Sequence, residues 1–187
     1  MRFSTVLIFI FLSLSLLLSA ASEKYRIMWR EDPSTTMCIG WVQNGGGTAT
    51  VYYDTTDHGG NLSAFRYSQG VDRSINHKGM AHRFTRLNGL QPNTAYYFYI
   101  EDADGQSSIF WFKTVPDDPY QTLSIIAGGD SRNNRIPRQK ANYLVSRMRP
   151  HAVFFGGDMT DDNTNTEWNN WLDDWQLTIG SDGRMIP

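Results

Sequence analysis

The pattern of apolar and polar residues divides the chain near residue 117. From 25 to 114, short runs alternate apolar with polar residues and are separated by Gly, Asn and Asp, without a helical period. This spacing predicts an antiparallel β-sandwich. In the run "MCIGWVQ", Met37, Ile39 and Trp41 fall on one face of a strand. The following "NGGG" predicts a turn, from which the strand "TATVYYD" returns.

The period changes after a Pro- and Asp-rich linker at 115–121. A continuous apolar strand, "TLSIIA", precedes a helical stretch with one apolar stripe, formed by Ala141, Leu144, Val145 and Met148. The strand "AVFF" follows, and then a second helix with an apolar stripe, formed by Trp168, Trp171, Leu172 and Trp175. Thr164 and Glu167 have the spacing of a capping box at the start of this helix. The order strand, helix, strand, helix predicts a parallel sheet.

Both of these strands end in Gly-Gly-Asp, so that Asp130 and Asp158 stand 28 positions apart. The carboxyl ends of neighbouring parallel strands meet at one sheet edge, about 4.8 Å apart, and we expect the two carboxylates to converge there. Converging carboxylates repel unless one takes up a proton or a cation lies between them, and Asp161 and Asp162 add negative charge. The pattern favours a metal ion. The alternative is that the aspartates only cap turns and helices.

The loop after the first aspartate carries two candidates for binding a substrate. The planar guanidinium of Arg132 is suited to clamping a phosphate, and it can equally neutralise the carboxylates. Asn133 can donate hydrogen bonds in the same loop, although Asn133 and Asn134 are also typical turn residues.

The N-terminal residues are typical of a secretory signal peptide, with Arg2, an apolar stretch at 6–18 and small residues up to Ala21. The apolar stretch is short for a stable membrane span. We expect cleavage near Ala21 and a secreted, periplasmic or extracellular protein. Without residues 1–21 the formal charge is −3, from 16 Lys and Arg against 19 Asp and Glu, and does not favour nucleic acid as a partner. With Cys38 as its single cysteine, the chain has no internal disulfide.

The spacing of Leu90, Pro92, Thr94 and Tyr96 resembles the corner of fibronectin type III-like domains, where the tyrosine hydroxyl bonds back to the backbone. A signal, such a sandwich, and then strand-GD, helix and strand-GDxx[DY] together resemble the purple acid phosphatases within the calcineurin-like metallophosphoesterases. The resemblance spans nearly all of the chain after the signal.

This resemblance implies two metal ions, with Asp130 bound to one and Asp158 bridging both. Asp161 stands where the purple enzymes have a metal-binding tyrosine, and we expect it to be a ligand or an orienting group. Arg132 stands where family members often have Gly or His. The implied metals are iron, zinc or manganese, and the implied partner is a small phosphorylated substrate bound by Arg132 and Asn133.

The expected domains are a signal peptide at 1–21, a fibronectin III-like β-sandwich at 22–116, and the first βαβα part of an α/β metallophosphoesterase domain at 117–187. The family's Gly-Asn-His-[Asp/Glu] and Gly-His-x-His blocks do not occur in the sequence. We therefore expect a fragment that is inactive alone, with its tryptophan stripe partly exposed on a two-stranded sheet. The sequence gives no indication of the oligomeric state.

The expected function is that of a secreted dinuclear-metal phosphoesterase, and two alternatives stay open. The tripeptide at 129–131 is also similar to the nucleophile block of GDS-type serine esterases, in which Ser131 would attack an ester. A non-catalytic cell-surface module would instead bind its ligand through the loops of the sandwich.

Overall fold

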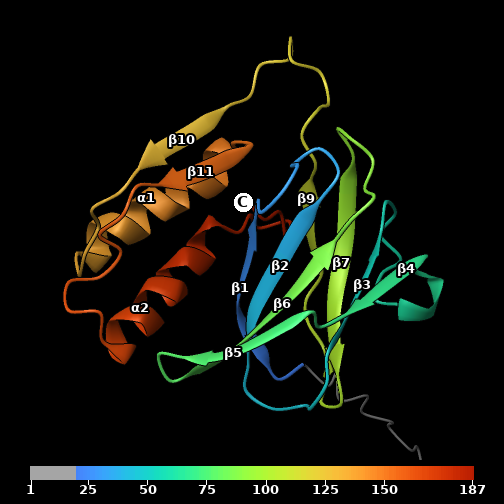
Figure 1. Cartoon of the computed structure of the whole chain (residues 1–187), viewed down its shortest axis with the longest axis horizontal. Helices are drawn as coiled ribbons and strands as arrows, with labels where there is room; N and C mark the ends of the chain where they lie inside the picture. The colour runs from blue at the N-terminus through green and yellow to red at the C-terminus, as the bar shows by residue number, and fades with distance from the viewer. Residues whose placement is uncertain (1–19) are drawn as a thin grey trace, which may run out of the picture.

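The computed structural model describes residues 20–187. The predicted signal peptide therefore lies outside the described residues, except for Ala20 and Ala21. Figure 1 shows a β-sandwich on one side of the molecule and a smaller unit, with helices, on the other.

The sandwich consists of two antiparallel sheets, as predicted. In order across the first sheet, the strands are β1 (Ser22–Met28), β2 (Met37–Gln43), β6 (Met80–Leu87) and β5 (Arg73–His77). The second sheet has the order β4 (Tyr67–Gly70), β3 (Thr50–Asp54), β7 (Ala95–Asp102) and β8 (Gly105–Gln106), and β9 (Phe110–Lys113) also pairs with β7. A short 3₁₀ helix, η1 (Leu62–Ala64), precedes β4.

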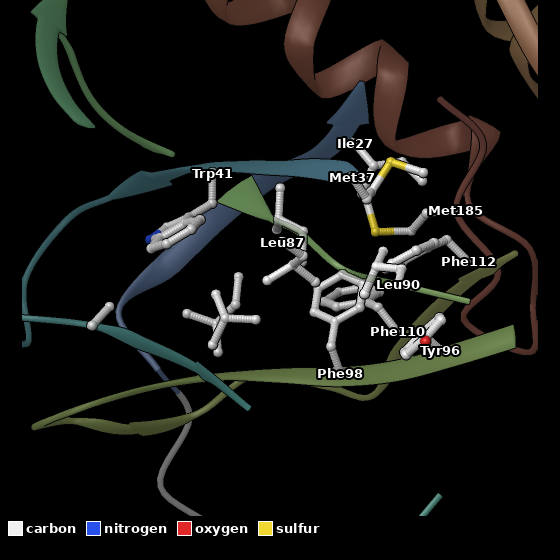
Figure 2. Close-up of a cluster of buried hydrophobic side chains, with 14 residues drawn as sticks. Ile27, Met37, Trp41, Leu87, Leu90, Tyr96, Phe98, Phe110, Phe112 and Met185 are labelled. Atoms are coloured by element: carbon white, nitrogen blue, oxygen red, sulfur yellow. The ribbon is translucent and has the colours of Figure 1, made fainter. Parts of the chain in front are cut away.

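The core of the sandwich lies between the two sheets (Figure 2). The predicted face of β2 enters it, because Met37, Ile39 and Trp41 are buried. The aromatic side chains Phe98 and Phe112 of the opposite sheet face them and are fully buried. Burial of such large apolar side chains stabilises each by about 1.5–3 kcal/mol relative to exposure, so the sandwich holds together without a disulfide.

The predicted return of the chain at "NGGG" is wrong as a hairpin. β2 pairs with β1 and β6, whereas β3 pairs with β4 and β7, so this segment connects the two sheets. Gly46 has a φ of +69°, and a Cβ there would lie 2.4 Å from Cγ of Asp102. The alternating pattern of two strands is the same in a hairpin and in a link between sheets, which is why the sequence did not separate them.

The predicted tyrosine corner is present. The hydroxyl of Tyr96 accepts a hydrogen bond of 2.8 Å from the backbone N–H of Gln91. The ring is buried beside Leu90 in the core. Tyr96 is therefore a packing residue, as its spacing indicated.

The second unit begins with β10 (Ile125–Gly128), α1 (Arg135–Met148) and β11 (Ala152–Phe155). It continues with α2 (Asn165–Trp175) and a 3₁₀ turn, η2 (Gln176–Thr178). β10 and β11 pair in parallel, with Ile125 opposite Ala152 and Gly128 opposite Phe155. The predicted neighbouring parallel strands are thus confirmed, and their carboxyl ends lie at one edge.

α2 begins with the predicted capping box. The Thr164 hydroxyl accepts from the N–H of Glu167, whose carboxylate accepts from the N–H of Thr164. The expectation of a partly exposed tryptophan stripe is wrong for Trp171, Leu172 and Trp175, which are all buried. The stripe packs in one cluster against side chains of the sandwich and of β11, namely Val42, Met80, Val153 and Phe155. α2 therefore packs between the two units (Figure 1).

The apolar stripe predicted for α1 is wrong in three of its four members. Only Val145 is buried, whereas Ala141 is exposed, and Leu144 and Met148 are 57% and 67% exposed. The buried face of the helix carries Arg138 and Asn142 instead. Both contact Asp174 of α2, so a polar network rather than an apolar stripe orients α1.

The last residues return to the sandwich. The backbone of Trp111 in β9 bonds with Gly183 and Met185, and the Trp111 indole donates to the carbonyl of Asp182. Met185 is 3% exposed in the sandwich core (Figure 2). The aromatic strand β9 therefore packs on a segment beyond its own sheet.

Candidate functional site

Backbone hydrogen bonds continue past the ends of β10 and β11 and hold the two Gly-Gly-Asp segments together. The N–H of Asp130 donates to the carbonyl of Gly157 at 3.0 Å, and the N–H of Arg132 donates to that of Asp158 at 2.8 Å. Asp130 and Asp158 adopt φ values of +54° and +45°, which non-glycine residues rarely do. The strain is localised where the two carboxylates leave the sheet.

The glycines allow the two segments to approach closely. A Cβ on Gly129 would lie 3.0 Å from the backbone nitrogen of Gly156 and 3.1 Å from its carbonyl carbon. These atoms belong to paired backbone and cannot move aside like a flexible side chain. The residue pair 129 and 156 therefore sets the separation of the strand ends, and with it the separation of Asp130 and Asp158.

The substitution Gly129→Ala is expected to lower the free energy of unfolding by about 1–3 kcal/mol, because its methyl group overpacks this contact. Urea unfolding followed by tryptophan fluorescence measures the change. Gly128→Ala is the matched control, since no heavy atom lies within 4 Å of its Cβ position. Equal losses of unfolding free energy in both variants would show that the close approach at Gly129 does not cause the destabilisation.

The side chain of Arg132 lies between the predicted metal ligands. Its Nε is 2.8 Å from Oδ1 of Asp130, and its Nη2 is 3.2 Å from Oδ2 of Asp158. Asp161 is farther, with Oδ1 4.0 Å from Nε. The hydrogen bond to Asp130 and the charges of all three carboxylates raise the pKa of Arg132. The two aspartates thus lie close together, and the cation between them in this structure is the guanidinium, whereas the pattern favoured a metal ion.

Asn133 connects the two loops of the site. Its amide donates to Oδ2 of Asp161 at 3.1 Å and also to the Glu167 carboxylate. This hydrogen bond from Asn133, followed by those from the backbone N–H groups of Thr164 and Asp162, lowers the pKa of Glu167. Glu167 therefore has a second role beyond the capping box, which its spacing alone did not indicate. Asn134 precedes α1 without a side-chain capping bond.

A buried ion pair holds the loop that follows β10, and the sequence did not predict it. Arg138 and Asp174 have side chains 3% and 1% exposed, with Nη2 and Oδ2 2.6 Å apart. Arg138 also donates to the Ser131 hydroxyl at 3.2 Å and to the carbonyl of Arg132. A signal was available: Asp174 lies three positions after Trp171 and next to Trp175, within the apolar stripe.

The carboxylates fit part of a metal site. Within residues 20–187, no group of three or more His, Cys, Asp or Glu side chains is arranged to hold a metal ion. Asp130 and Asp158 nevertheless direct oxygen atoms at one cation, and carboxylate oxygens suit hard divalent ions. The role of Asp161 as a ligand stays a prediction, as do those of Arg132 and Asn133 toward a substrate.

No helix in the described part of the chain is long and apolar enough to cross a membrane. The predicted secretion and signal peptide stay predictions.

Comparison with known proteins places the sandwich in a family. The family model "Purple acid Phosphatase, N-terminal domain" matches residues 22–114. A purple acid phosphatase, PPD1 from yellow lupin (Lupinus luteus) seeds, has a similar fold with a TM-score of 0.68 at 12% identity, over 89% of this chain and 34% of that one. The structure of PhoD matches with a TM-score of 0.59 at 12% identity, over 89% of this chain and 38% of that one.

The chain spans only about a third of the length of these two structures. No curated protein sequence matches it. At this low identity the two structures show the fold alone, whereas the family model identifies the sandwich. The chain therefore carries the N-terminal domain of the purple acid phosphatase family.

Proposed function

We propose that this chain is the first part of a secreted, dinuclear-metal phosphoesterase that hydrolyses small phosphate esters. The observation that carries the proposal is the convergence of Asp130 and Asp158 on one cation at the carboxyl ends of neighbouring parallel strands. The family of the sandwich and the fold shared with PPD1 and PhoD support it. In this proposal, residues 117–187 begin the metallophosphoesterase domain.

Asp130 and Asp158 would hold the metal ions, with Asp161 as a further ligand or as an orienting group. When bound, the metal ions supply positive charge and an activated nucleophile near neutral pH. The Arg132 side chain is 53% exposed, and in this proposal it would turn from the carboxylates toward a phosphate oxygen, which its planar fork fits. Asn133 keeps Asp161 in place through its hydrogen bond.

The serine esterase alternative finds less support. The Ser131 hydroxyl accepts a hydrogen bond from Arg138, and a guanidinium stays protonated and cannot take a proton from a nucleophile. None of the described side chains that hydrogen-bond to this hydroxyl is a general base. No specific observation favours the non-catalytic binding module over the phosphoesterase.

Asp158→Asn in the full-length protein is expected to lower the hydrolysis of p-nitrophenyl phosphate at least about 100-fold, because it removes a metal ligand. Ser131→Ala is expected to keep most of the activity. Bound metal, measured by elemental analysis, should fall in the first variant only, and a chelator should abolish the wild-type activity. The reverse pattern, with Ser131 essential and the chelator without effect, would establish the serine esterase.

A further inference from the structure

A cavity of about 320 Å³ lies between the sandwich and the second unit. It is bounded by the β5–β6 hairpin, by β1 and by α2. Its basic lining residues are Arg26, His77, Lys78 and His82, and its aromatic ones are Phe84 and Trp168. None of the described residues that line it is acidic. We call this cavity the interdomain pocket.

Arg26 has no carboxylate partner among residues 20–187, although it is partly buried. Its Nη1 donates to the carbonyl of Lys24 at 3.0 Å, and its Nη2 donates to Nδ1 of His82 at 3.0 Å. Its guanidinium carbon also lies 5.1 Å from the centre of the Phe84 ring. Burial lowers the pKa of Arg26 to about 10, so the group is still charged at neutral pH.

The neighbouring buried cation is compensated in a different way. Lys24 is 6% exposed, and its ammonium lies 2.9 Å from a Glu23 oxygen and 3.0 Å from an Asp173 oxygen. A charge taken out of water without an opposite charge is costly, and Arg26, which is partly buried two residues farther along the same strand, has no carboxylate among the described residues to compensate it. The difference indicates that a negative group supplied from outside the described chain completes the pocket.

The hydrogen bonds and charges of His82 and Lys78 are compatible with a negative group in the pocket. Burial, followed by the charge of Arg26, lowers the pKa of His82. We assign it the neutral form, accepting at Nδ1 from Arg26 and donating from Nε2 to the carbonyl of His77. Lys78 uses one of its three N–H donors in a hydrogen bond to the carbonyl of Asn163, in the loop after β11. The arginine and lysine that line the pocket, Arg26 and Lys78, are therefore its permanent positive charges at neutral pH.

We propose that the interdomain pocket binds a small aromatic anion. Its negative group would lie between Arg26 and Lys78, and its ring would pack against Phe84 and Trp168. The volume lies at the lower end of the range for small-molecule sites, about 300–1,000 Å³. Because Arg26 and Phe84 belong to the sandwich and Trp168 to α2, such a ligand would also strengthen the contact between the two units.

Naphthalene-2-sulfonate is the probe for this site, because it is permanently charged and a poor metal ligand. In calorimetric titrations of the chain in EDTA, we expect saturable binding with a Kd below about 1 mM. The neutral analogue 2-naphthalenemethanol is expected to bind at least about 10-fold more weakly, since it cannot compensate the charge of Arg26. Binding of the sulfonate should weaken as salt is raised.

Arg26→Gln is expected to weaken binding of the sulfonate at least about 10-fold. Lys140→Gln, on the exposed face of α1, removes the same charge away from the pocket and should leave the Kd unchanged. If Arg26→Gln does not fold, Lys78→Gln and Trp168→Ala test the charged and the aromatic contact separately, each with an expected loss of at least about threefold.

Three results would overturn the proposal. They are no saturable heat up to about 10 mM sulfonate, equal affinity for the neutral analogue, and an equal loss in Lys140→Gln. Asp158→Asn should bind the sulfonate as the wild type does, because the pocket does not include the Gly-Gly-Asp edge. The outcome is thus independent of whether the phosphoesterase proposal holds.

Discussion

Asp174→Asn is expected to lower the free energy of unfolding by about 3–5 kcal/mol, the cost of breaking a buried ion pair on one side. The Asp174 side chain is 1% exposed and faces Arg138, which is 3% exposed. It also accepts from Arg135 and from Gln139, each at 2.7 Å. Asparagine keeps the shape of the side chain but loses the charge, which leaves the Arg138 guanidinium buried without compensation.

The same contact predicts how this difference depends on pH. Burial would raise the pKa of Asp174, but the hydrogen bonds from Arg135, Gln139 and Arg138 together outweigh it, so the pKa is lowered. A carboxyl with a lowered folded-state pKa stabilises fully above its unfolded value, about 3.9, and loses this contribution as the pH falls through the folded pKa. The gap between wild type and Asp174→Asn should therefore be constant from about pH 5 to pH 8 and shrink below about pH 4.

Urea unfolding followed by tryptophan fluorescence measures both effects, because three of the tryptophans lie on α2, the helix that carries Asp174. Asp182→Asn is the matched control, since its pair with Arg149 has side chains 42% and 41% exposed. Such an exposed pair contributes about 0–1 kcal/mol. Equal losses in the two variants, or a pH-independent gap, would show that the Asp174 charge does not hold the unit together.

The effect should reach the candidate site. Arg138 donates to the carbonyl of Arg132 and to the Ser131 hydroxyl, so the network of Asp174 fixes the loop that carries Asp130. A loop held only by its own turn would have to keep Asp130 and Arg132 at positive φ without support. The same network of Asp174 therefore holds α1 on α2 and fixes the geometry of the carboxylates.

The sequence predicted those features that depend on periodicity and spacing. The change of period near residue 117 separated the sandwich from the parallel pair, and Gly-Gly-Asp after each strand placed Asp130 and Asp158 at one edge. The capping box at Thr164 and the corner at Tyr96 followed from fixed spacings. Each of these signals is local, or depends on a topology rule with few exceptions.

The incorrect predictions concern a helix face that buries polar side chains and a helix face that lies between the two units. The stripe on α1 was assigned by counting apolar residues, whereas the buried face is set by Arg138 and Asn142, which bond to Asp174. The tryptophan stripe of α2 was expected to be partly exposed because the sheet was considered without the sandwich that covers it. Periodicity states which residues share a face and does not state which partner that face meets.

Whether Arg132 neutralises the carboxylates could not be decided from the sequence either. The place of its guanidinium depends on the backbone of Asp130, Arg132 and Asp158, which all have positive φ values. Aspartate and arginine do not require a positive φ, so the residue types do not reveal this conformation. The structure places its guanidinium within hydrogen-bonding distance of two carboxylates. A bound metal ion and this guanidinium would thus compete for the same oxygen atoms.

Arg132→Gln is therefore expected to raise the affinity of the chain for Mn²⁺ at least about 10-fold, which corresponds to about 1.4 kcal/mol. The substitution removes the cation that lies 2.8 Å from Asp130 and 3.2 Å from Asp158, and it leaves their carboxylates without compensation. Titration with Mn²⁺, with free ion counted by electron paramagnetic resonance, measures the affinity directly and does not depend on catalysis.

Two variants separate competition at the site from a general change of charge. Arg147→Gln removes an exposed arginine from the last turn of α1 and should leave the affinity unchanged. Adding Asp158→Asn to Arg132→Gln should abolish the gain, because the second carboxylate is then lost. An affinity lowered by Arg132→Gln would mean that the guanidinium aligns the aspartates rather than competes for them, and an unchanged affinity would mean that they do not bind a cation together. Only the expected rise links the convergence of the two aspartates to a metal site.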